Sequence, residues 1–186
     1  MTDAATPAPV GVDALIARQE IADAMHRYAR GVDRGDWDLV RSAYHPDAFD
    51  DHVEFRGGVD ALVAWLDERF AGADNSSHFL GSSLVEFADA GTALVETYFI
   101  SSRLRAPGAH DARAEQGDAV CRQSWGRYVD RFERRDGAWK VADRRVVLES
   151  RFTAIAIGGL RGDEDYWGRR DGDDAVFALG RALGIR

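Results

Sequence analysis

The spacing of the hydrophobic residues changes once along the chain. Between residues 12 and 70, apolar side chains recur every three or four positions, which is the period of a helix with one buried face. From Ser77 to Phe152 they alternate with polar side chains, which is the period of a half-buried strand. This order predicts an α+β fold in which three N-terminal helices pack on one face of a strongly curved antiparallel sheet.

The first helix is predicted to run from about Val12 to Arg34. Its buried stripe consists of Ile21, Met25, Tyr28 and Val32. Gly35 suits the left-handed position that closes a helix, and Asp36 suits the N-cap of the next one. The second helix is expected to end near Tyr44, because a proline at position 46 disfavours helical geometry in the residue before it.

A short strand is expected at Ala48–Phe55, a third helix at Val59–Phe70 and a last short helix at Asp174–Leu183. The four long strands are predicted at Ser77–Ala88, Thr92–Arg105, Asp118–Arg134 and Ala138–Phe152. Glycine-bearing turns of hairpin length separate the first strand of this set from the second and the third from the fourth. There is no internal repeat and no alternation of strand and helix, so a doubly wound nucleotide-binding fold is not expected.

The domain organisation follows from these elements. Residues 1–10 are rich in alanine and proline and are predicted to form a disordered leader. Residues 11–152 form the single folded domain, and residues 153–186 form a C-terminal extension. Its apolar start, residues 154–160, contains two adjacent glycines. We expect this extension to close the mouth of a pocket or to pack on a neighbouring subunit.

Composition limits the possible partners and location. The 186 residues carry a formal net charge of −8, which argues against nucleic acid or an anionic membrane surface as a partner. One cysteine excludes an internal disulfide framework and any multi-cysteine metal site. No apolar run approaches the ~20 residues that span a bilayer, and the N-terminus does not resemble a signal peptide. A cytoplasmic protein that does not bind membranes is expected.

Asp33 is the first candidate functional residue, because its predicted position is unfavourable for a carboxylate. It falls in the last turn of the first helix, where the exposed carbonyl groups make a carboxylate unfavourable. One interpretation is that Arg30 or Arg34 offsets this charge at the surface. The other is that Asp33 faces inward and holds a histidine. His78, at the start of a predicted strand, is the best general base in the chain because its ordinary pKa lies near neutrality, although a lone histidine is more often structural.

Arg144 is the second candidate functional residue, because it is a charged residue on an apolar strand face. On the last long strand, Ala142, Arg144, Val146, Leu148 and Phe152 are assigned to one face, and Arg144 is the only charged member. Burying an unpaired guanidinium would cost several kcal/mol, so Arg144 needs an anion or a wet cavity. The two alternatives are an internal ion pair with a carboxylate such as Asp33 and a contact with a substrate oxygen.

Other catalytic and metal-binding patterns receive little support. The chain has no serine-nucleophile elbow, no phosphate-binding glycine loop and no zinc-binding helix motif. His45, Asp47, Asp50, Asp51 and His52 lie close together in sequence but lack the spacing of a metal site. No cofactor and no metal are therefore expected.

Several of these motifs together resemble a known family. They are Tyr28-Ala-Arg-Gly-Val-Asp33, Gly35-Asp-Trp37, His78 at the start of a long strand, and Gly137-Ala-Trp-Lys-Val-Ala-Asp-Arg144. Together they resemble the SnoaL-like family of the nuclear transport factor 2-like (NTF2-like) superfamily over residues 12–152. The best match is to the branch that contains bile-acid 7α-dehydratase, hexachlorocyclohexane dehydrochlorinase and scytalone dehydratase.

The resemblance implies a cone-shaped α+β barrel around an apolar pocket and a cofactor-independent elimination on an apolar cyclic, polyketide-like or steroid-like molecule. In that family pattern, His78 is the base, Asp33 its partner, Arg144 a charge stabiliser and Tyr28 a proton donor. An isomerase, a cyclase and a non-catalytic ligand- or partner-binding domain are the alternatives. A homodimer or homotrimer is expected. Large side chains that could line the pocket, or simply fill the core, include Phe49, Trp65, Tyr98 and Trp125.

Overall fold

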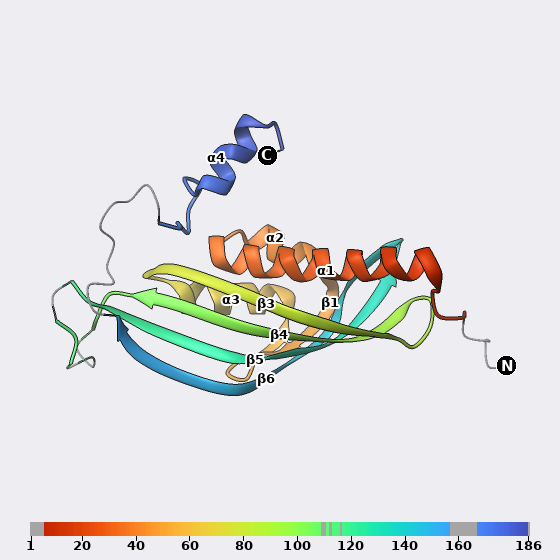
Figure 1. Ribbon diagram of the computed structural model, residues 1–186, viewed down its shortest axis with the longest axis horizontal. Helices are drawn as coiled ribbons and strands as arrows, with labels where there is room; N and C mark the ends of the chain where they lie inside the picture. The colour runs from red at the N-terminus through yellow and green to blue at the C-terminus, as the bar shows by residue number, and fades with distance from the viewer. Residues whose placement is uncertain (1–5, 109–110, 112, 116, 157–166, 186) are drawn as a thin grey trace.

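The computed structural model describes residues 6–108, 111, 113–115, 117–156 and 167–185. Four helices and six strands form a mixed α+β fold in which α1, α2 and α3 lie on one side of a strongly curved sheet (Figure 1). The helices are α1 (Gly11–Arg34), α2 (Trp37–Ser42), α3 (Val59–Phe70) and α4 (Ala175–Ala182). The strands are β1 (Tyr44–Asp51), β2 (Arg56–Gly58), β3 (Ala73–Phe87), β4 (Thr92–Arg105), β5 (Ala119–Arg135) and β6 (Ala138–Ala156).

The predicted helix α1 and its end are confirmed. The stripe that the sequence assigns to the core is buried, with Ile21, Met25, Tyr28 and Val32 each 1% exposed. Gly35 has a φ of 69°, the left-handed conformation that closes the helix. The side chain of Asp36 then accepts a hydrogen bond of 3.0 Å from the backbone N–H of Leu39 and caps α2. This tight turn fixes the orientation of the residues in the last turn of α1.

The segment after α2 differs from the prediction. The helix ends at Ser42, and the strand expected at Ala48–Phe55 is β1, which begins earlier, at Tyr44, and ends at Asp51. The short strand β2 follows at Arg56–Gly58 and was not predicted. Because Tyr44 is in extended backbone paired with β6, its side chain lies in the core, 2% exposed. Helix propensity near Ser42 was a poor guide because sheet pairing fixes this segment.

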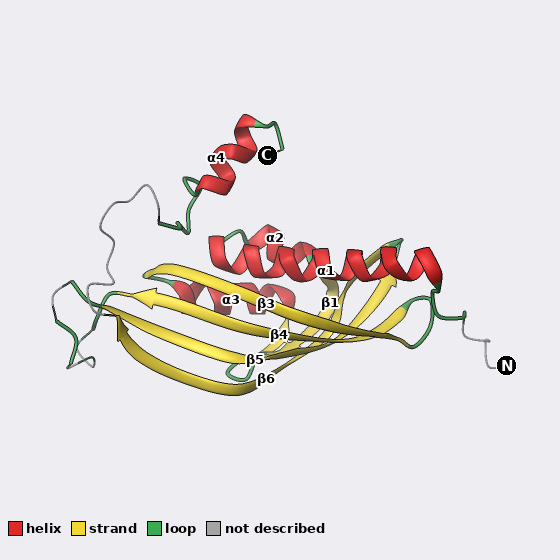
Figure 2. Cartoon of the chain, in the orientation of Figure 1, coloured by secondary structure: helices red, strands yellow, loops and turns green. Residues whose placement is uncertain are grey.

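The sheet order is β2-β1-β6-β5-β4-β3, so the two edge strands, β2 and β3, are consecutive in the chain and are joined through α3. All neighbouring strands are antiparallel except β1 and β6, which run parallel, so the expectation of a wholly antiparallel sheet was wrong at that pair. The strands curve around the helices without closing, since β2 and β3 form the edges (Figure 2).

Two irregularities in the pairing of β5 with β6 change which residues face the core. The register shifts once between Arg131 and Phe132 of β5 and once between Trp125 and Gly126 of β5. Strict alternation from Ala142 and Arg144 would place Trp139 and Val141 on the outer face, but the shift leaves both of them buried. Phe152, assigned to the inner face, is 45% exposed. Each bulge shifts the alternation by one residue, so period-two reasoning fails across it.

The C-terminal segment returns to the end of α1, and α4 projects from there on the side of α1 away from the sheet (Figure 1). Ala154, Ile155 and Ala156 belong to β6, and the two adjacent glycines of the extension, at positions 158 and 159, lie outside the described residues. Of the predicted leader, residues 1–5 also lie outside them, whereas the Thr6 carbonyl accepts a hydrogen bond from the N–H of Ala90. No helix in the described ranges is long and apolar enough to cross a membrane.

Candidate functional site

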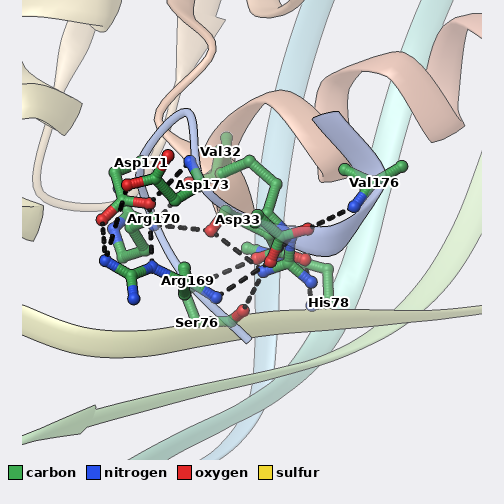
Figure 3. Close-up of polar contacts among 11 residues, drawn as sticks. Val32, Asp33, Ser76, His78, Arg169, Arg170, Asp171, Asp173 and Val176 are labelled. Carbon is green, nitrogen blue, oxygen red and sulfur yellow. Dashed lines mark hydrogen bonds and ion pairs between the residues drawn. The ribbon is translucent and has the colours of Figure 1, made fainter. Parts of the chain in front are cut away.

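Asp33 and His78 meet where α1 ends beside the start of β3 (Figure 3). Asp33 Oδ1 lies 2.7 Å from His78 Nδ1, and Asp33 Oδ2 accepts a 2.7 Å hydrogen bond from the His78 backbone N–H. The hydroxyl of Ser76 donates a third bond, of 2.8 Å, to Oδ1. A carboxylate can only accept, so Nδ1 carries the proton and Nε2 is left as the basic nitrogen of neutral His78.

Both interpretations of Asp33 describe part of this arrangement. The carboxylate turns inward to His78, and arginines meet the exposed carbonyl groups at the same helix end. Arg170 Nη1 donates to the carbonyl oxygens of Val32 at 2.6 Å and Asp33 at 3.2 Å, and Arg34 also donates to that of Asp33 at 3.2 Å. Burial raises the pKa of Asp33, but the charge and hydrogen bonds of His78 and the bond from Ser76 outweigh it, so the net pKa is lowered. Asp33 is therefore ionised at neutral pH.

His78 lines a cavity of about 70 Å³ enclosed between the helices and the inner face of the sheet. The cavity is bounded by Tyr28, Val32, His52, Val53, Leu66, Arg69, Phe70, His78, Phe99, Ser101, Ser124, Tyr128, Val146, Leu148 and Arg151. A second cavity of about 50 Å³ shares His78, Phe70, Ser101, Ser124 and Arg69 with the first. Apolar and polar groups both contribute, so the lining is more polar than the expected apolar pocket.

Tyr28 forms one wall of this cavity beside His78. The two ring centroids are 6.4 Å apart, and Tyr28 also packs edge to face against Tyr128 at 5.6 Å. Burial raises the pKa of Tyr28 above its ordinary value, an effect that the nearby Arg144 charge only partly opposes. The phenol therefore stays protonated at neutral pH and can donate a hydrogen bond.

Arg144 lies behind this wall and is not among the residues that line either cavity. Its side chain is fully buried, and its carboxylate partner is Asp130 rather than Asp33. Nε and Nη2 donate to the two oxygens of Asp130 at 2.8 and 2.6 Å, and Nη1 donates to the Tyr44 hydroxyl at 3.0 Å. The guanidinium also lies over the ring of Tyr28, 4.4 Å from its centroid. Burial would lower the pKa of Arg144, but Asp130 raises it well above the ordinary value.

A second histidine–aspartate pair, which was not predicted from the sequence, lies beside the same cavity, and its histidine, His52, lines it. The hydroxyl of Tyr44 donates a 2.8 Å hydrogen bond to Asp50, and the other carboxylate oxygen of Asp50 lies 3.2 Å from His52 Nδ1. The residues Ala48, Asp50 and His52 alternate along the end of β1, and the first two are buried. This alternation was the available signal, but it was obscured by the acidic composition of the segment.

The four aromatic residues expected at the pocket do not line it. Phe49, Tyr98 and Trp125 are 46%, 53% and 47% exposed. Trp65 stacks on Phe55, with ring centroids 5.4 Å apart, and packs against His52 from outside the cavity lining. In the strands, these residues alternate with inward-facing ones, so a shift of one position separates a wall residue from a surface residue.

The arrangement combines a basic nitrogen, a buried carboxylate that fixes its orientation and protonated donors facing one cavity. Such a set can remove a proton from carbon and return it to a departing oxygen. Among the described residues, no group of three or more histidine, cysteine, aspartate or glutamate side chains is placed to hold a metal ion.

Comparisons with known proteins agree with this fold. A family model described as a SnoaL-like domain matches residues 13–145. Hexachlorocyclohexane dehydrochlorinase LinA-type3 from Novosphingobium barchaimii LL02 superposes with a TM-score of 0.64 and 17% identity, covering 82% of this chain and 97% of that chain. A protein from Novosphingobium aromaticivorans DSM 12444, proposed to be a scytalone dehydratase, gives a TM-score of 0.63 and 18% identity, covering 81% of this chain and 98% of that one.

The protein Rv3472 from Mycobacterium tuberculosis, whose function is unknown, covers more of this chain. Its TM-score is 0.59 and its identity 20%, with coverage of 92% of this chain and 94% of that chain. At such identities the superpositions establish a shared fold. A search of the curated proteins found no match.

Proposed function

Because the chain belongs to the SnoaL-like family, we propose that it is a lyase that works without a cofactor and eliminates a hydroxyl or similar group from a small cyclic or polyketide-like molecule. The observation that carries this proposal is the pairing of His78 with ionised Asp33 at the wall of a cavity. Two proteins of the same fold support an elimination reaction. One is named a dehydrochlorinase, and the other is proposed to be a scytalone dehydratase.

In the proposed reaction, Nε2 of His78 removes a proton from a carbon atom next to an activating group. The electron pair of the broken C–H bond becomes the new carbon–carbon double bond, and the C–O bond to the departing hydroxyl breaks. The proton taken up by the enzyme balances the hydroxide that leaves, so the products are the alkene and water. Asp33 stabilises the imidazolium that forms on His78 and holds its tautomer.

Tyr28 and His52 are the candidates to donate a hydrogen bond or a proton to the departing oxygen. Both line the cavity with His78, and Tyr28 stays protonated because burial raises its pKa. Arg144 is assigned a positioning role, since it holds Tyr28 through its guanidinium face and has no cavity contact of its own. This replaces the direct substrate contact suggested by the family pattern.

Two other functions share parts of this site. An isomerase or cyclase would use the same base but would return the proton to carbon or form a carbon–carbon bond. A non-catalytic binding domain would use the cavity alone. The position of the His78–Asp33 pair at the cavity favours catalysis over binding, because a carboxylate that orients a histidine is the arrangement in which histidine acts as a general base.

The test compares the wild-type protein with His78→Ala on a panel of cyclic β-hydroxy ketones, chlorinated cyclohexanes and β,γ-unsaturated ketones, each class with neutral members and members that carry a carboxylate or phosphate group. Elimination from a hydroxy ketone is followed by the absorbance of the conjugated product, and dehydrochlorination by release of chloride. The wild type is expected to turn over a member of the first two classes in the presence of EDTA, and His78→Ala to lose about 10²–10⁴-fold in rate. Turnover of β,γ-unsaturated ketones alone would indicate an isomerase, and near wild-type rates in His78→Ala would overturn the assignment of the base.

A further inference from the structure

Four arginines from four different elements gather around the space beside His78. Arg69 ends α3, Arg103 lies near the end of β4, Arg122 near the start of β5 and Arg151 near the end of β6. Arg69 lines both cavities, Arg103 and Arg122 line the second, and Arg151 lines the first. This group, called the arginine cluster below, therefore borders the two cavities that the proposed base also lines.

The cluster is short of negative charge among the residues that the structure describes. Glu54 accepts from Arg69 at 2.5 Å and from Arg151 at 2.6 Å, and lies 3.5 Å from Arg122. Among the side chains that the structure describes, which exclude that of Asp74, no carboxylate pairs with Arg103, and Arg103 donates to the backbone oxygen of Arg69. Among the described side chains, Glu54 is thus the one carboxylate that pairs with the four guanidinium groups of the cluster, which leaves an excess of positive charge within that set.

Sheet pairing makes this arrangement unfavourable by itself. Arg103 and Arg122 are direct cross-strand partners, and like charges in that position destabilise a sheet. Burial and the neighbouring charges of Arg69 and Arg122 lower the pKa of Arg103 to about 10. Burial would raise the pKa of Glu54, but Arg151 and Arg69 lower it to about 2. An oxyanion between Arg103 and Arg122 would relieve this repulsion.

The remaining polar groups suit the same ligand. Ser76, Ser101, Ser102 and Ser124 line the second cavity together with the arginines. Hydroxyl groups and forked guanidinium donors are the groups that bind carboxylate and phosphate oxygens most specifically. Phe70 also lines the second cavity, and the guanidinium of Arg103 lies 5.3 Å from the centroid of its aromatic ring. Phe70 therefore offers an apolar surface to the body of a ligand.

We propose that the substrate carries an oxyanion, a carboxylate or a phosphate, which Arg103 and Arg122 bind while the reacting carbon lies against His78. This assignment rests on the proposed function, because it places the substrate of that reaction. It revises the purely apolar substrate to a molecule with an apolar body and one anionic group. The apolar body would contact Phe70, Phe99 and Leu148.

Binding of simple probes to the full chain tests the proposal without a known substrate. Benzoate and phenyl phosphate are the anionic probes, and benzamide is the neutral match to benzoate. By isothermal titration, at least one anionic probe should bind at least about tenfold more tightly than benzamide, with an affinity that falls as salt rises. If benzoate binds more tightly than phenyl phosphate, the anionic group of the ligand is a carboxylate; if phenyl phosphate binds more tightly, it is a phosphate. Equal binding of benzamide and both anions would overturn the proposal.

Two variants locate the site. Arg103→Gln and Arg122→Gln should each weaken the preferred anion by at least about tenfold, whereas Arg41→Gln, an exposed arginine of α2, should not change its affinity. Because each cluster variant removes like-charge repulsion, the free protein should unfold at the same or a higher temperature. A lower unfolding temperature together with unchanged anion affinity would show that the cluster is structural and would overturn the proposal.

Two further variants test the anion site against the base and against the chain's own acidic residues. His78→Ala keeps the arginines, so it should bind the anion like the wild type even if it has lost turnover; anion binding and catalysis can therefore fail independently.

The sequence also holds Asp163, Glu164 and Asp165, which lie outside the described residues. If D163N/E164Q/D165N binds the anion more than about tenfold more tightly than the wild type, the chain's own acidic residues are the occupant and the proposal is overturned.

Discussion

His78 donates to both oxygens of Asp33, from its ring Nδ1 and from its own backbone N–H, over the same distance of 2.7 Å. One residue thus fixes the carboxylate through a side-chain contact and a main-chain contact together. The main-chain bond anchors Asp33 to the start of β3 irrespective of the orientation of the ring. The side-chain bond then sets the orientation and tautomer of the ring.

The first prediction concerns this double contact. Asp33→Asn should keep the bond from the backbone N–H of His78, so the protein should fold, but the amide can hold the wrong histidine tautomer. The rate of the proposed elimination should fall by about 10²–10⁴-fold, as for loss of the base itself. Steady-state kinetics with the wild-type substrate measures this. Asp38→Asn, on the exposed face of α2, is the matched control and should leave the rate unchanged.

The second prediction is a pH dependence of stability. The folded-state pKa of Asp33 lies below its ordinary value of 3.8, so its ionised form stabilises the native state fully above that pH. The stabilisation is lost as the pH falls through the lower folded-state pKa. Urea unfolding between pH 6 and pH 2 should therefore show the wild type losing its advantage over Asp33→Asn below about pH 4. Curves that stay parallel throughout this range would contradict the lowered pKa.

The third prediction concerns the buried ion pair of Arg144. Replacing Arg144 by methionine leaves Asp130 as an uncompensated buried charge and should cost about 3–5 kcal/mol of unfolding free energy. Arg144→Lys should recover little, because an ammonium group cannot bind both carboxylate oxygens in the planar fork that Arg144 uses. Urea denaturation of the variants measures both effects.

Arg41→Met supplies the control for that experiment. Arg41 pairs with Asp38 and Asp60 at the surface, where both carboxylates are almost fully exposed. Such a pair contributes only about 0–1 kcal/mol. If Arg144→Met were as mild as Arg41→Met while abolishing turnover, Arg144 would act on the substrate after all.

The sequence could predict the elements that depend on local signals. The stripe on α1, the left-handed Gly35 and the Asp36 cap lie within a few residues of one another, and each has a single physical meaning. Helix α3 was also predicted with its observed ends, Val59 and Phe70. These features need no knowledge of the rest of the fold.

The parts that could not be predicted depend on partners far away in sequence. The bulges opposite Gly126 and Phe132 exist only in the pairing of β5 with β6, so alternation assigned Trp139 and Phe152 to the wrong faces. Asp130 as the partner of Arg144 and the meeting of Arg103 with Arg122 follow from the strand register. A linear pattern contains no signal for a register that the curved sheet determines.

The fourth prediction concerns the C-terminal segment. Arg170 donates to two carbonyl groups at the end of α1, and Asp174 pairs with Arg34 at 3.3 Å. Deleting residues 157–186, after the end of β6, should keep the sheet and its circular-dichroism spectrum but reduce turnover, because the last turn of α1 that carries Asp33 loses these bonds. Charge-assisted bonds of this kind contribute about 1.5–3 kcal/mol each. A truncated protein with full activity would contradict a role of the segment at the site.

Arg170→Ala tests the same contact without removing the rest of the segment. It should reproduce most of the loss of turnover caused by the deletion. Arg181→Ala, in the last turn of α4, is the control and should behave like the wild type. Loss of activity in the deletion but not in Arg170→Ala would assign the effect to another part of the segment.

The last prediction is that the outer face of the sheet forms a contact between copies of the chain. The helices α1, α2 and α3 lie on one side of β3–β6 (Figure 1). Large exposed apolar side chains alternate with the buried ones on the same strands and therefore face the other side. They are Leu84, Leu94, Tyr98, Trp125 and Phe152, each at least 45% exposed. An apolar set of this size on a sheet is typical of an interface. Sedimentation at micromolar concentration should give two or three times the chain mass of 20.5 kDa.

Trp125→Glu combined with Tyr98→Glu should convert this oligomer into a monomer, because two carboxylates would have to be desolvated at its centre. Leu183→Glu, an exposed apolar residue beyond the sheet, is the matched control and should leave the mass unchanged. Since neither Trp125 nor Tyr98 lines the cavities beside His78, the monomer should retain the anion-binding site. A wild-type protein that sediments as a single chain would contradict the interface.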